Sequence, residues 1–199
     1  MSVGLFMGIV PSYVEESEDS GRKLIEAINS RLKKLNLPLY SESDEVPDVY
    51  VDNSFGRSEL DHHSASCFMQ LADLAEENDL RKRHLAILTN PYRVVFLPQD
   101  FSEPFETDYK EEIFDEPIEV WAGSAPKLLE ELVELASHLG IPLENGILSD
   151  EVATKINEFE LLSENDDGEL AEDERTAWLA IYEGARLAVE NKIALSLAG

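Results

Sequence analysis

Residues 56–70, GRSELDHHSASCFMQ, contain side chains of the types that carry out catalysis or bind metals. Asp61, His62 and His63 are followed closely by Cys67, the one cysteine of the chain. A carboxylate beside a histidine can act as a general acid and base, and a cysteine beside a histidine can act as a nucleophile. Histidine and cysteine are also common zinc ligands. Asp61, His62 and His63 are therefore the candidate catalytic residues.

These side chains would be positioned by a helix that the hydrophobic spacing predicts over roughly residues 58–79. Glu59, His63 and Cys67 are four residues apart, so a helix would place them on one side. The same helix places Cys67 in an apolar stripe with Leu60, Leu71 and Leu74. A free cysteine in such a stripe usually behaves as a small buried hydrophobe. We therefore expect Cys67 to be buried and predict no metal site in this stretch.

A second candidate is SENDDGELAEDE, residues 163–174, which aligns with the loop of a calcium-binding EF-hand. Ser163 stands where the first aspartate of that loop is expected, and no second loop accompanies it. An acidic linker between two helices would have the same pattern. We therefore predict no calcium site and no cofactor, with a degenerate EF-hand-like module at 163–174 as an alternative.

The remaining periodicities predict strands interleaved with helices. Strands are expected at 2–10, 48–54, 118–123 and 192–198, and a hairpin over 84–98 that turns at Asn90 and Pro91. Helices are expected at 21–35 with Ser20 as cap, at 125–139 with Ser124 as cap, at 150–162 and at 172–190. Residues 99–117 are expected to be irregular. This pattern predicts an α/β fold, with mixed α+β as a variant: a single domain over 1–199 with five or six strands in a mixed sheet and flanking helices.

Three blocks, RVVFLPQDFSEPF, GSAPKLLEELVELASHLGIPL and ERTAWLAIYEGARLAVE, occupy residues 93–105, 123–143 and 174–190. Together they resemble a family of uncharacterised bacterial cytoplasmic proteins. The shared residues are those of helix and strand packing. The resemblance therefore supports the fold class and implies no activity.

The net charge of the chain excludes more classes of binding partner than any sequence motif does. The 199 residues include 42 acids and 16 bases, which gives a net charge of −26. Nucleic acids and anionic membranes are bound mainly through lysine and arginine, so neither is an expected partner. A basic protein would be attracted instead. Plain solubility of the chain is the alternative explanation of so many acids.

The sequence thus favours a non-enzymatic, acidic binding protein, of which an immunity or antitoxin-type inhibitor of a basic protein is one form. A small enzyme that uses Asp61, His62, His63 and Cys67 is the rival. The single cysteine and the lack of a signal peptide predict a cytoplasmic location. If the charge serves recognition, the acids of segments 15–20, 106–119 and 163–174 should gather in one patch.

Overall fold

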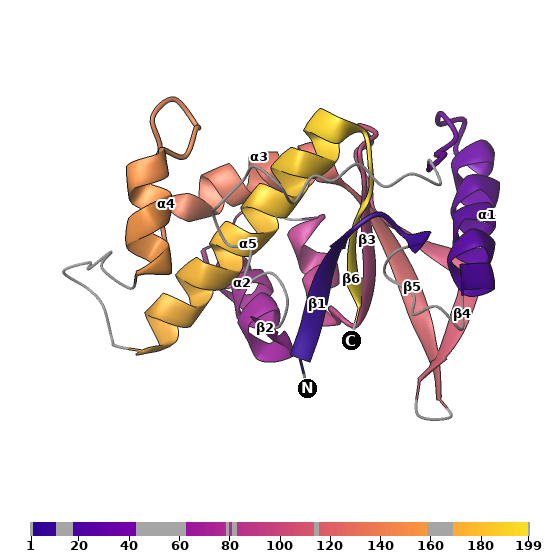
Figure 1. Ribbon diagram of the computed structural model, residues 1–199, viewed down its shortest axis with the longest axis horizontal. Helices are drawn as coiled ribbons and strands as arrows, with labels where there is room; N and C mark the ends of the chain where they lie inside the picture. The colour runs from indigo at the N-terminus through magenta and orange to yellow at the C-terminus, as the bar shows by residue number, and fades with distance from the viewer. Residues whose placement is uncertain are drawn as a thin grey trace.

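The computed structural model describes residues 2–10, 18–42, 63–78, 80, 83–113, 116–158 and 169–198. Within this part of the chain one mixed sheet carries helices on both faces, which confirms the predicted class (Figure 1). The strands are β1 (Ser2–Met7), β2 (His63–Ser64), β3 (Arg93–Leu97), β4 (Phe105–Ile113), β5 (Glu116–Ser124) and β6 (Leu195–Ala198). The helices are α1 (Glu18–Lys34), α2 (Ala65–Glu77), the 3-10 helix η3 (Leu85–Thr89), α3 (Ala125–Ala136), α4 (Asp150–Asn157) and α5 (Glu169–Asn191).

The sheet has the order β2-β1-β6-β3-β5-β4. β3 and β5 run parallel, and the other neighbouring strands run antiparallel. The first and last described strands, β1 and β6, therefore lie side by side in the middle of the fold. None of the described helices is both long and apolar enough to cross a membrane.

Successive side chains of β3 point to opposite faces of the sheet, and both faces are covered by helices. Val94 and Phe96 face the larger core, which α2, α3 and α5 complete. Val95 and Leu97 face the smaller core beneath α1. All four side chains are buried, so β3 shows a continuous apolar run instead of alternating polar residues. Figure 1 shows α1 with β4 and β5 at one end of the molecule and the other helices beyond the opposite face.

Helix α3 follows the prediction closely. The Ser124 Oγ accepts a hydrogen bond from the backbone N–H of Lys127 at 3.3 Å, and Pro126 lies in the first turn. The predicted buried stripe is confirmed, because Leu128, Leu132 and Leu135 are fully buried. The turn after the helix ends at Gly140, whose φ of 68° suits glycine.

The predicted hairpin over 84–98 is wrong in its first half. Residues 85–89 form η3, and only 93–97 form a strand. Leu85 and Leu88 are both fully buried, and a spacing of three residues places them on one face of a 3-10 helix. A short apolar run can form either a strand or a buried helical turn. Here the run packs against α2 as a helical turn.

The expectation that 99–117 is irregular is also wrong, since β4 and β5 form the hairpin of this sheet. In β4, Phe105 and Thr107 are buried and Tyr109 is half-buried, while Asp108, between Thr107 and Tyr109, is exposed. This alternation indicates a strand with one face on the core. In the sequence this alternation is not recognisable, because the outward positions carry acids.

Two helix starts also differ from the prediction. α1 begins at Glu18, so Ser20 lies inside the helix and is not its cap. α2 begins at Ala65 and not near residue 58, because β2 pairs with β1 immediately before it. In α5 the predicted face is buried except for Val189, which is 36% exposed. The strand expected at 48–54 lies outside the described residues.

Candidate functional site: an acidic surface and a polar cavity

His63 and Cys67 do not share a helix. His63 belongs to β2 and pairs with Val3 of β1, whereas Cys67 lies in α2. A stack of Glu59, His63 and Cys67 along one helix, the arrangement that a zinc or Cys-His site would need, therefore does not include His63. Asp61 and His62 lie outside the described residues. Where the structure is described, no three histidine, cysteine or acidic side chains are grouped so that they could hold a metal ion.

Cys67 is buried, as predicted, with 7% of its surface exposed. Burial raises the pKa of its thiol, and the negative charge of Asp173 raises the pKa further. A buried thiol with a raised pKa is a poor nucleophile, because the thiolate is the reactive form.

We expect Cys67 in the native protein to react with a thiol reagent such as DTNB far more slowly than in urea. The reason is that labelling requires a local opening of α2 and ionisation of a disfavoured thiolate. Absorbance of the released thiolate at pH 8 measures both rates. Equal rates in the two states would contradict the burial of this side chain.

The second half of the calcium-loop alignment is helical. Residues 169–174 form the first turns of α5, and residues 163–168 lie outside the described residues. In an EF-hand, the seventh loop position, here Glu169, supplies a backbone carbonyl to calcium. Inside an α-helix that carbonyl accepts the N–H four residues further on. The Glu169 carbonyl is therefore not available as the calcium ligand that the alignment requires.

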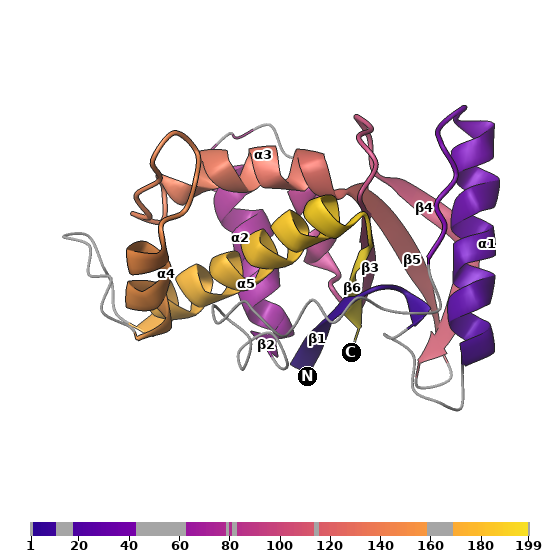
Figure 2. The same ribbon diagram turned by 45° about the horizontal axis from the view of Figure 1, so that its top comes forward.

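The described parts of the three acidic segments do not form one patch. The described part of the second segment lies in the β4–β5 hairpin, beside α1. Figures 1 and 2 place the beginning of α5, which holds the described part of the third segment, at the opposite end of the molecule. The expectation of a single patch made by these segments is therefore wrong, and negative charge covers both ends of the fold.

One group of carboxylates lies where the end of α2 meets the beginning of α5. Burial raises the pKa of Glu174, Arg175 lowers it, and the negative charges of Glu77 and Asp173 raise it further. These carboxylates are thus close enough to repel one another. α2 contains no lysine or arginine that could neutralise them.

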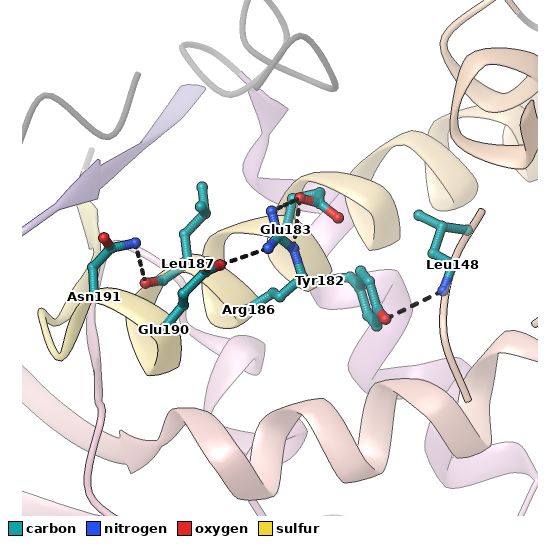
Figure 3. A network of polar contacts seen from close by, with 7 residues as sticks. All are labelled: Leu148, Tyr182, Glu183, Arg186, Leu187, Glu190 and Asn191. Atoms are coloured by element: carbon teal, nitrogen blue, oxygen red, sulfur yellow. Dashed lines mark hydrogen bonds and ion pairs between the residues drawn. The ribbon is translucent and has the colours of Figure 1, made fainter. Parts of the chain in front are cut away.

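The two arginines of α5 are used within the protein. Arg175 is 4% exposed, and its Nε donates to the carbonyl of Leu139 at 2.8 Å. Figure 3 shows Arg186 between two acids of its own helix: it donates to Glu183 at 2.8 and 3.0 Å and to Glu190 at 2.8 Å. Arg186 is therefore used by its own part of the helix, whereas Arg175 offsets part of the negative charge at the beginning of the helix, because it lowers the pKa of Glu174.

A polar cavity of about 350 Å³ lies between α3 and two other segments, residues 83–84 just before η3 and Ser102. One of its walls is Glu131, whose carboxylate accepts the backbone N–H groups of Arg83, His84 and Leu85 at 2.7 to 3.1 Å. These are N–H groups that a helix start leaves without partners inside the helix. Burial raises the pKa of Glu131, and the three N–H groups oppose that rise.

His84 also lines the cavity and is 1% exposed. Its Nδ1 accepts the backbone N–H of Ser124 at 3.0 Å, so this N–H at the start of α3 already has a partner. Burial lowers the pKa of His84 to about 4, so the ring is neutral at pH 7. Gly123 has a packing role, because a Cβ there would lie 2.7 Å from the Phe96 ring.

The two cations of the cavity are each held by acids. The ammonium of Lys127 lies 2.9 Å from Glu130 and 3.7 Å from Asp100. Arg83 forms an ion pair with Glu103. The acids of this region outnumber its bases, namely Asp100, Glu103, Glu130, Glu131 and Glu134 against Arg83 and Lys127.

None of the cavity residues was among the predicted site residues. Glu131 and the segment that it caps are separated by 46 to 48 positions, and no local pattern connects them. The sequence feature that could have indicated this cavity is a polar pair, Arg83 and His84, directly before an apolar run.

Comparison with known proteins gives one match. The sequence model of a family described as "Putative DNA-mimic protein" matches residues 57–197, more than half of the chain. This range includes the three blocks that resemble an uncharacterised family. No curated protein and no solved structure matches the chain.

Proposed function

The chain belongs to the family described as "Putative DNA-mimic protein", and we propose from this that it binds a DNA-binding protein at the surface that otherwise contacts DNA. The observation that carries the proposal is the charge of −26, much of it on carboxylates that basic side chains of the protein do not neutralise. DNA-binding proteins contact phosphates through lysine and arginine. A surface of fixed carboxylates presents those side chains with negative charge, as the phosphates of DNA do.

The described helices support this proposal in two ways. Glu174 lies near enough to Glu77 and Asp173 for their negative charges to raise its pKa. Arg186 is committed to Glu183 and Glu190 and is not used by those carboxylates, and Arg175 offsets only part of the charge of Glu174. A protein that needed its acids only for solubility would gain nothing from holding like charges together.

Because the acidic segments do not gather in one patch, the proposal rests on the family match and on the net charge. The mode of action is then non-enzymatic: the protein occupies the partner and excludes DNA from it. An immunity or antitoxin-type inhibitor of a basic nuclease is one form of this function, and a regulator of a DNA-binding protein is another. Both forms require competition with DNA.

Competition with DNA is therefore the expected result. The immobilised protein should retain basic proteins from the heparin-binding fraction of a bacterial lysate at 0.1 M salt, and duplex DNA should release them. The complex should also weaken steeply toward 1 M salt, because the Debye length falls from about 10 Å to about 3 Å over that range. Gel analysis of the proteins released by each eluant measures both effects.

The control is immobilised poly-glutamate at the same density of charge, which has carboxylates but no fold. DNA-displaceable proteins that bind the folded chain and not the poly-glutamate would support mimicry. Binding that is equal for the two, or that DNA does not reverse, would contradict the proposed function.

A further inference from the structure

We draw no further inference here: the strongest candidate, the surface formed by the basic last turn of α1 and the exposed side chains of Leu35 and Leu39 that follow it, carries none, because Lys34 already pairs with Asp108 of the neighbouring strand β4 and nothing in the structure shows what covers the two leucines.

Discussion

Replacing Trp178 with alanine should lower the free energy of unfolding by about 3–5 kcal/mol, the largest effect expected of any single substitution in this chain. Trp178 is fully buried in the larger core and stacks on Tyr182 with the ring centres 4.7 Å apart. Its Nε1 donates to the carbonyl of Leu132 at 2.9 Å, which ties α5 to α3. The variant loses apolar burial, leaves a cavity and removes the donor of a buried carbonyl. Urea unfolding followed by circular dichroism measures the change.

Trp178→Phe separates these contributions. Phenylalanine keeps an aromatic ring against Tyr182 but cannot donate to Leu132, so we expect a loss of about 2 kcal/mol. The dependence of unfolding on urea should be unchanged, since the surface exposed on unfolding is nearly the same. A loss below about 1 kcal/mol for the alanine variant would show that α5 does not pack on α3 as described.

Replacing Glu131 with alanine should destabilise the protein by about 2–4 kcal/mol, although glutamate is usually a surface residue. The carboxylate accepts the N–H groups of Arg83, His84 and Leu85, and these three donors have no partner inside η3. Removing it leaves buried donors unsatisfied and frees the segment that carries His84. We expect the His84 ring signals in the NMR spectrum to shift or broaden as the segment loosens.

Glu134→Ala is the control for this prediction. Glu134 is exposed on the same helix, one turn beyond Glu130, and its loss should change the free energy of unfolding by no more than about 0.5 kcal/mol. Comparable losses for Glu131→Ala and Glu134→Ala would show that the hydrogen bonds to residues 83–85 contribute little.

Local sequence determined much of the helix and strand content. Ser124, Pro126, the leucines of α3 and the turn at Gly140 identify that helix from start to end, because capping and a period of 3.6 are properties of one short segment. The apolar runs of β1 and β6 likewise identify two central strands. The net charge, which follows from composition alone, indicated a basic partner before any fold was known.

Tertiary structure decided the elements whose local patterns were ambiguous. Residues 85–89 could be a strand or a helical turn, and burial of Leu85 and Leu88 made them η3. β4 carries so many acids that its alternation becomes visible only once Phe105 and Thr107 are seen to face the core. His63 lies in β2 and not in the predicted helix, because it pairs with Val3.

The cavity shows the limit of local sequence most clearly. Glu131, His84 and Ser124 are bonded to one another's segments across separations of 40 to 48 positions. Each residue by itself has an ordinary local role: an acid on a helix, a histidine before an apolar run, a helix cap. Hydrogen bonding between distant segments depends on how the chain folds back on itself, and only the packing of residues 83–84 and Ser102 against α3 created the cavity.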